Sequence, residues 1–239
     1  MIEKPLNICI LAAGKGTRMN SSLPKVLHEI NNKPLIHHVI ETSMSLSPEK
    51  IIAIIGYKKE LVKQSIAKYS IDYAYQEKQK GTAHAIEQCL EQIQGTSGNT
   101  LVLSGDVPFI SKETLDILVS THNRNNSLAS LISAKMENPS GYGRIVRDDD
   151  NKFTRIVEHK DANSEQLDIM EINSGIYMFD SEILCEKILL IKNNNNQQEY
   201  YLTDIFDFVD KDRISVIKTS NVQEINGINT LEQLKNIAN

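Results

Sequence analysis

Compact apolar runs alternate with amphipathic segments along the first half of the chain. Residues 6–13 are an apolar run that Gly14 and Gly16 stop, which is typical of a buried strand opening into a turn. The same reasoning predicts further strands at 51–56, 71–76, 100–106 and 128–134, and helices at 34–44, 59–69, 82–92 and 112–123. This alternation predicts a mostly parallel sheet with helices around it, which binds ligands beyond the carboxyl ends of its strands.

The pattern becomes richer in β-structure after about residue 135. Short alternating segments at 143–147, 153–158 and 173–179 predict a small antiparallel extension. The asparagine-rich residues 193–198 predict a solvated loop, followed by a helix at 201–209, a strand at 214–218 and a terminal helix at 231–238. We therefore expect an α/β fold: a Rossmann-like three-layer α/β/α arrangement with a mostly parallel mixed sheet.

Composition and charge narrow the possible functions. The 239 residues are 40% hydrophobic and 24% charged, and no unbroken apolar stretch reaches about 18 residues, so neither disorder nor a membrane span is expected. The net charge of -5 argues against nucleic acid as a partner, because phosphate-backbone binding needs clustered Lys and Arg. Three scattered cysteines without a CxxC pair, and no secretory signal pattern, favour a reducing compartment, by default the cytoplasm.

The turn after the first strand is a candidate phosphate-binding loop. Gly14 and Gly16 let backbone amides approach a polyphosphate, and Arg18 and Lys25 add two permanent cations. A dinucleotide fingerprint does not fit, because Met19 stands where Gly or Ala is needed. The Walker pattern does not fit either, since no Gly-Lys-Ser/Thr closes the loop. The alternative is a plain glycine turn with solvated basic residues.

A carboxylate follows the predicted strand at 100–106. Asp106, directly after Gly105, is of the type that holds Mg²⁺ together with substrate phosphates and water. An aspartate that caps the next turn, fixed by Pro108, is an equally good interpretation of this residue taken alone.

A series of motifs in chain order resembles a known family. They are Leu11-Ala12-Ala13-Gly14-Lys15-Gly16-Thr17-Arg18-Met19, Pro24-Lys25, Gln76 with Gly81-Thr82-Ala83-His84-Ala85, Gly105-Asp106-Val107-Pro108, Gly141-Tyr142-Gly143-Arg144, Val157-Glu158-His159-Lys160-Asp161-Ala162, Glu171-Ile172-Asn173-Ser174-Gly175 and Glu199-Tyr200-Tyr201-Leu202-Thr203-Asp204. Together they closely resemble the uridyltransferase domain of the bifunctional N-acetylglucosamine-1-phosphate uridyltransferase/glucosamine-1-phosphate acetyltransferase family (GlmU). The first motif alone would indicate only the wider group of sugar nucleotidyltransferases.

The resemblance implies a role for each matching residue. It implies that the uridine is contacted by Leu11, Ala13 and Gly14, the uracil by Gln76, Gly81 and Thr82, the phosphates by Arg18 and Lys25, and the N-acetylglucosamine part by Gly143, Glu158 and Asn173. It also implies that Asp106 and Asn229 hold Mg²⁺ and that Gly105 and Asn229 bind substrate. Arg18, Lys25 and Asp106 would be the catalytic residues. Two positions depart from the family pattern: Ser104 stands where Tyr is common, and Asn226 where an acidic residue is frequent.

The implied reaction is uridylyl transfer from UTP to N-acetylglucosamine 1-phosphate, which gives UDP-N-acetylglucosamine and pyrophosphate. We expect one nucleotidyltransferase domain over residues 1–229, with a nucleotide-binding half at about 1–135, a sugar-binding half at about 136–229 under the antiparallel extension, and a terminal helix at 230–239. Two alternatives stay open: transfer to another sugar or from another base, such as a cytidylyltransferase, and a nucleotide-sugar-binding module without catalysis.

The resemblance also carries expectations about what lies outside it. In that family a β-helix built from hexapeptide repeats carries acetyl transfer and trimerisation, and no hexapeptide period occurs before Asn239. We therefore expect no acetyltransferase activity from these residues, and a monomer or weak dimer.

Overall fold

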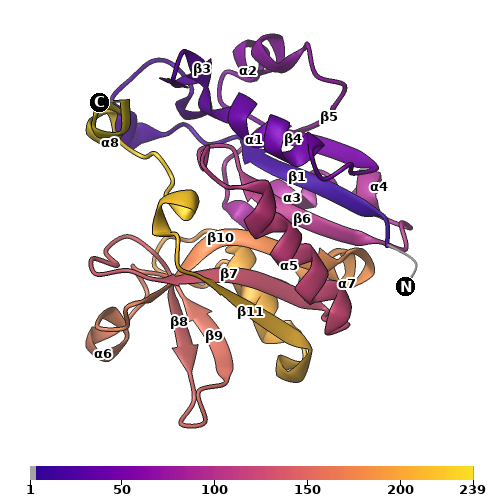
Figure 1. The fold of residues 1–239 in the computed structure, drawn as a ribbon, viewed down its shortest axis with the longest axis vertical. Helices are drawn as coiled ribbons and strands as arrows, with labels where there is room; N and C mark the ends of the chain where they lie inside the picture. The colour runs from indigo at the N-terminus through magenta and orange to yellow at the C-terminus, as the bar shows by residue number, and fades with distance from the viewer. Residues whose placement is uncertain (1–3, 239) are drawn as a thin grey trace.

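The computed structural model describes residues 4–238 as three layers around one mixed sheet (Figure 1). The strands are β1 (Leu6–Ala12), β2 (Glu29–Ile30), β3 (Lys33–Pro34), β4 (Lys50–Ile55), β5 (Asp72–Tyr75), β6 (Asn99–Ser104), β7 (Ala129–Lys135), β8 (Arg144–Arg147), β9 (Phe153–Val157), β10 (Glu171–Asp180) and β11 (Ile214–Thr219). The α-helices are α1 (Leu35–Met44), α2 (Lys59–Ile66), α3 (Thr82–Glu87), α4 (Leu90–Ile93), α5 (Lys112–Arg124), α6 (Ser164–Leu167), α7 (Ser181–Lys187) and α8 (Leu231–Ala238). The 3-10 helices are η1 (Thr17–Met19), η2 (Lys25–Leu27), η3 (Ile188–Leu190), η4 (Leu202–Phe208), η5 (Lys211–Arg213) and η6 (Val222–Ile225).

The main sheet has the strand order β11-β7-β10-β6-β1-β4-β5. Strands β5, β4, β1 and β6 are parallel, whereas β10 is antiparallel to both of its neighbours, β6 and β7. The hairpin of β8 and β9 joins the sheet through β10. The expected α/β/α fold with a mostly parallel sheet and an antiparallel extension is therefore confirmed.

Alternate residues of the central strands explain the layers. In β1, Ile8 and Ile10 pack with α1, α2 and α5 on one face, and Cys9 faces α3, α4 and α7 on the other. Both faces of the strand are buried, which is why its sequence reads as a continuous apolar run and not as an alternating one. The same explanation holds for β4 and β6.

Three predicted elements differ in detail from the structure. The helix expected at 82–92 is divided into α3 and α4, because Cys89 has φ -112 and ψ 6, outside helical geometry. The segment 201–209 forms the 3-10 helix η4. The strand expected at 173–179 extends over Glu171–Asp180 and carries a register shift between Asn173 and Tyr177, around Gly175 at φ +80.

The chain after β11 leaves the lower half of the molecule and crosses to the upper half (Figure 1). It passes through η6 and ends in α8, which contacts β2. Ile228 packs there with Ile30 and Leu35, so residues from both ends of the sequence share one small core. This crossing places the segment around residues 226–229 at the carboxyl ends of the parallel strands. No helix within residues 4–238 has the length and apolar character needed to cross a bilayer.

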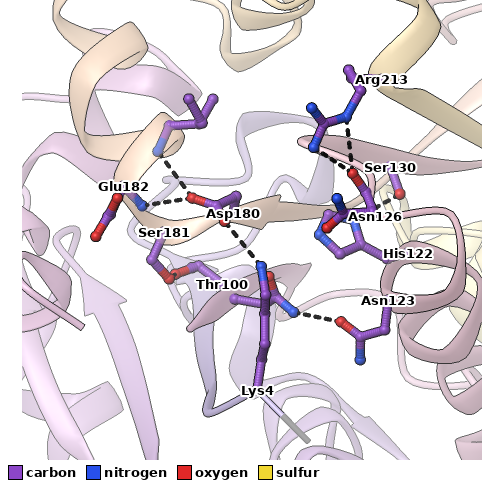
Figure 2. A network of polar contacts seen from close by, with 12 residues as sticks. Lys4, Thr100, His122, Asn123, Asn126, Ser130, Asp180, Ser181, Glu182 and Arg213 are labelled. Carbon is purple, nitrogen blue, oxygen red and sulfur yellow. Dashed lines mark hydrogen bonds and ion pairs between the residues drawn. The ribbon is translucent and has the colours of Figure 1, made fainter. Parts of the chain in front are cut away.

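A network of polar contacts lies at the opposite end of the central strands, where β1 begins and β10 ends (Figure 2). Asp180 caps α7 by accepting hydrogen bonds from the backbone amides of Glu182 and Ile183, and it pairs with Lys4 at 3.3 Å. To the right of this pair in Figure 2, His122 shares a hydrogen bond of 2.8 Å with Ser130. These contacts join the end of β10 to the residue Lys4 before β1, and α5 to β7, away from the strand ends that carry the candidate site.

Candidate active site

A cavity of about 380 Å³ opens at the carboxyl ends of the parallel strands. It lies between β1 and β6, where the strand order changes direction along the sheet, the usual ligand position in doubly wound folds. Nine of the predicted site residues line it: Leu11, Ala13, Gly14, Arg18, Lys25, Gln76, Gly81, Thr82 and Asp106. The fold thus brings residues from four separate motifs to one place.

The glycine loop after β1 is shaped by a close approach of Lys25. Gly16 has φ +64, and a Cβ there would lie 2.5 Å from the Cβ of Lys25. Only glycine fits both the backbone conformation and the space. A Cβ at Gly14 would meet nothing within 4 Å, so the backbone at this position is open to the cavity that it lines. The loop can therefore present its main chain to a ligand while Lys25 is held against it.

Gln76 also lines the cavity and is only 3% exposed. Its side-chain nitrogen donates to the Gly81 carbonyl and to Nδ1 of His84, both at 3.0 Å. His84 must be unprotonated at Nδ1 to accept this bond, and burial does lower the pKa of its imidazole. The Gln76 amide is therefore fixed in one orientation, which suits a group that recognises the edge of a base.

The loop that carries Gly81 packs directly on the chain that leads into η4. Gly81 has φ +115, and a Cβ there would collide with the backbone of Tyr200. The hydroxyl of Thr82 accepts a hydrogen bond of 2.9 Å from the Leu202 amide, and the Ala83 amide donates to the Tyr200 carbonyl. This contact shows that the two motifs, which are far apart in the sequence, pack against each other in the structure.

Arg18, Lys25, Asp106 and Asn229 form one cluster, and the first three of them line the cavity. Lys25 forms an ion pair with Asp106, and its ammonium also donates to Oδ1 of Asn229 at 2.9 Å. Arg18 donates to the same amide oxygen at 2.7 Å. The predicted phosphate-binding cations and the predicted metal-binding oxygens therefore lie in direct contact.

Backbone contacts hold the two oxygen-bearing residues of this cluster. The Ile228 amide donates to the Asp106 carbonyl at 2.9 Å, and a Cβ at Gly227 would lie 3.1 Å from Oδ2 of Asp106. Gly105 lies against the main chain of β1, because its amide donates to the Leu11 carbonyl at 2.9 Å. The glycines before Asp106 and Asn229 thus allow the close packing that brings these side chains together.

The residues expected to bind the sugar form a second group, at the base of the β8–β9 hairpin. The Asn173 amide donates to the Gly143 carbonyl at 2.9 Å, and Oε2 of Glu158 would lie 3.5 Å from a Cβ at Gly143. Thr203 donates to Oε1 of Glu158 at 3.0 Å. Burial raises the pKa of Glu158, and the Thr203 hydrogen bond opposes that rise. These three residues meet one another but do not line the cavity that holds Gln76 and Lys25.

The structure adds residues that the motifs did not assign. Thr17, Val26, Gln79, Ala85 and Glu199 also line the cavity. Glu199 is the first residue of a family motif, so the sequence could have indicated it as a site residue. Gln79 lies in a polar segment outside the motifs, and the sequence gives no signal for it. The structure also shows where the two residues that depart from the family pattern lie.

Ser104 lines the cavity, and Asn226 accepts a hydrogen bond of 3.3 Å from the Tyr142 hydroxyl. No group of three or more His, Cys, Asp or Glu side chains within residues 4–238 is arranged to hold a metal ion.

This doubly wound sheet, with a cavity at its switch point, has the architecture of α/β proteins that bind ligands at the carboxyl ends of their strands. The chain belongs to the nucleotidyl transferase family, whose sequence model matches residues 8–218. It is 44% identical over 228 residues to the bifunctional protein GlmU of Picosynechococcus sp., covering 95% of this chain and 50% of that protein.

Two further relatives agree with this assignment. The bifunctional GlmU proteins of Staphylococcus saprophyticus and Geobacillus thermodenitrificans are each 43% identical over 222 residues, or 92% of this chain. The chain spans about half the length of the curated relatives it matches. The resemblance found in the sequence motifs is confirmed.

Proposed function

We propose that this protein transfers the uridylyl group of UTP to N-acetylglucosamine 1-phosphate, giving UDP-N-acetylglucosamine and pyrophosphate. The observation that carries the proposal is the cavity itself, because the fixed Gln76 amide and the Arg18 and Lys25 cations line the same space. Bifunctional GlmU proteins are similar to the chain over 92–95% of its length. A nucleoside triphosphate has the matching polarity, with a base at one end and anionic phosphates at the other.

Different residues of the cavity would bind the base and the phosphates of UTP. Gln76 and the main chain of Gly81 would hydrogen-bond the uracil edge, with Thr82 positioning this loop. Leu11, Ala13 and Gly14 would lie along the nucleoside, since Leu11 stands near the end of β1 and the other two follow that strand in the cavity wall. Arg18 and Lys25 would hold the β- and γ-phosphates, because charge-assisted hydrogen bonds to phosphate are among the strongest available.

Asp106 and Asn229 fit a magnesium ion by the chemistry of their donors. Both offer oxygen atoms, the ligands that Mg²⁺ takes together with water and substrate phosphates. The Lys25 ammonium contacts both oxygens, so they already converge on one positive charge. Mg²⁺ bound there would neutralise phosphate charge and align the reacting groups.

The chain needs no general base for this reaction. The attacking oxygen belongs to the phosphate of the acceptor sugar, which is already ionised near neutral pH, and it attacks the α-phosphorus of UTP as pyrophosphate leaves. Arg18 and Lys25 would stabilise the charge that moves onto pyrophosphate. Gly143, Glu158 and Asn173 would hold the acceptor sugar so that its phosphate meets the α-phosphorus.

This division of work extends to the parts of the chain. We propose that residues up to about 135 bind the nucleotide, that about 136–229 bind the sugar, and that the helix after them packs the Asn229 segment against β2. Residues 230–239 would then serve the fold and not the chemistry. Cysteine usage supports a cytoplasmic site of action, since Cys9, Cys89 and Cys185 are all free thiols.

Two other functions share parts of this site. A nucleotidyltransferase for another base or sugar would use the same cations. The only feature that favours uracil over another base is the fixed direction of the Gln76 hydrogen bonds. A nucleotide-sugar-binding module without catalysis is motivated by Ser104 and Asn226, which depart from the family pattern beside the site.

Pyrophosphate release from UTP and N-acetylglucosamine 1-phosphate, with and without Mg²⁺, tests the proposal. We expect release that needs the metal and that Asp106→Asn loses. Faster release with CTP would support the alternative base. Saturable UTP binding without release would support the binding module and contradict catalysis.

A further inference from the structure

Arg144 is a fully buried arginine without an acidic partner. It begins β8 directly after Gly143, and only 2% of its surface is exposed. None of the ion pairs within residues 4–238 includes it, and its Nε is buried without any hydrogen-bond partner. Removing a guanidinium from water is costly unless a carboxylate compensates it. A methionine of similar length would fill this space without that cost, so the arginine needs another explanation.

The contacts of Arg144 are all with main chain. Its Nη1 donates to the Tyr142 carbonyl, and its Nη2 donates to the Leu167 carbonyl at 3.4 Å. Leu167 is the last residue of α6, where carbonyl groups have no partner inside the helix. The planar guanidinium can reach two such acceptors at once, which a lysine ammonium does less well. Through these two hydrogen bonds Arg144 links two backbone segments, the turn that ends at Tyr142 and the end of α6.

Both fastened segments adjoin the group that we assign to the acceptor sugar. Tyr142 precedes Gly143, whose carbonyl accepts the Asn173 amide. Helix α6 contacts β8 and lies beside the β8–β9 hairpin (Figure 1). The buried guanidinium thus adjoins the sugar-binding group through the main chain of Tyr142 and Gly143, and it is not itself one of the residues assigned to the sugar.

We propose that Arg144 is a positioning residue for the acceptor sugar phosphate: it fixes the main chain of Tyr142 and Gly143 against α6 without touching a substrate. This inference rests on the proposed function, since it assigns the β8–β9 region to the acceptor. It predicts that the loss of Arg144 weakens binding of the sugar phosphate and leaves the binding of UTP unchanged. The reason is that the cavity that would bind UTP contains no residue of the β8–β9 region.

Steady-state kinetics of Arg144→Met and Arg144→Lys test this inference. Arg147→Met is the matched control, because Arg147 lies on the same strand but pairs with Glu171. We expect Arg144→Met to raise the KM for N-acetylglucosamine 1-phosphate by roughly tenfold or more and to change the KM for UTP less than about twofold. Arg144→Lys should restore part of the loss. Equal changes for both substrates, or no change for the sugar phosphate, would overturn the assignment.

Hydrogen–deuterium exchange of the ligand-free protein gives a readout that needs no turnover. Arg144→Met should speed exchange at 139–143 and at 163–168, whereas Arg147→Met should leave both segments near the wild-type rate. Unchanged exchange at these segments would contradict the fastening role. If Arg144→Met does not fold, Arg144→Lys is measured in both assays against the same expectations. A wild-type protein that releases no pyrophosphate would refute the proposed function instead, and the exchange data would still decide whether Arg144 fastens the two segments.

Discussion

Arg18 and Lys25 show at the scale of single residues how the site is prepared for anions. Both donate to the Asn229 amide oxygen, and Lys25 also pairs with Asp106. Polar groups that are already in place when charge develops do not have to reorganise during the reaction, which is why such groups contribute strongly to catalysis. Their arrangement makes each cation separately testable.

Arg18→Ala should slow pyrophosphate release strongly. By analogy with other preorganised charge contacts, we expect a barrier increase of roughly 2.7–4 kcal/mol, or a rate loss of about 10²–10³. Lys15→Ala is the control, because Lys15 is an exposed cation in the same loop that lies 5.8 Å from the Tyr57 ring centre and is not among the cavity-lining residues. Turnover by Arg18→Ala equal to that of Lys15→Ala would exclude a catalytic role for Arg18.

Gly81 tests whether the base end of the cavity depends on the packing of one loop. Gly81→Ala would place a Cβ against the Tyr200 backbone at a positive φ, so we expect weaker UTP binding by about tenfold and a stability loss of roughly 1–3 kcal/mol. Gly95→Ala is the matched control: Gly95 also has a positive φ, +78, but a Cβ there meets nothing within 4 Å. It should lose some stability and keep UTP affinity, measured by calorimetry. Equal affinities in the two variants would contradict the role given to this loop.

At the scale of elements, α5 and β7 are joined through a buried histidine. His122 is 1% exposed, shares a hydrogen bond with Ser130 and has a buried Nε2 without a partner (Figure 2). Burial, with Lys4 as a further cause and opposed by Asp180, lowers the pKa of His122 from 6.5 to about 4. The imidazole is therefore neutral in the folded protein at pH 7.

This lowered pKa predicts a stability loss in acid. Between about pH 6.5 and 4 the unfolded chain binds a proton that folded His122 does not, so the free energy of unfolding should fall with pH over this window. Each pKa unit corresponds to about 1.4 kcal/mol, so the full effect is roughly 3 kcal/mol. Urea unfolding at pH 7 and pH 4.5 measures the larger part of this effect.

A titration-free variant is the control for this effect. His122→Gln should be less stable at pH 7, because it disturbs the bond to Ser130, and should lose less stability on acidification than the wild-type protein. The same loss in both proteins would show that other groups cause the acid sensitivity.

At the scale of the whole molecule, the sequence predicts the central sheet better than the site that the sheet builds. β1, β4 and β6 are buried on both faces, so their apolar runs are visible without any tertiary information. The position of β10 is not visible in this way, since its antiparallel place between β6 and β7 depends on pairing with strands far away in the sequence. The break at Cys89 and the 3-10 geometry of η4 depend on packing and not on local preference.

The same limit applies to the site. The glycine loop and Asp106 are visible as strand-end chemistry in the sequence, and the resemblance supplies the remaining residues. The contact of Asn229 with Arg18 joins residues 211 positions apart and exists because the chain after β11 crosses the molecule (Figure 1). The buried, unpaired state of Arg144 likewise emerges only when α6 packs on β8.

Mass spectrometry of the reaction products tests the central claim most directly. The protein would be incubated with UTP, Mg²⁺ and N-acetylglucosamine 1-phosphate that carries ¹⁸O in its phosphate. Attack of the sugar phosphate on the α-phosphorus predicts UDP-N-acetylglucosamine that keeps the label, together with unlabelled pyrophosphate. Labelled pyrophosphate, or no UDP-sugar from a protein that binds UTP, would contradict uridylyl transfer at this site.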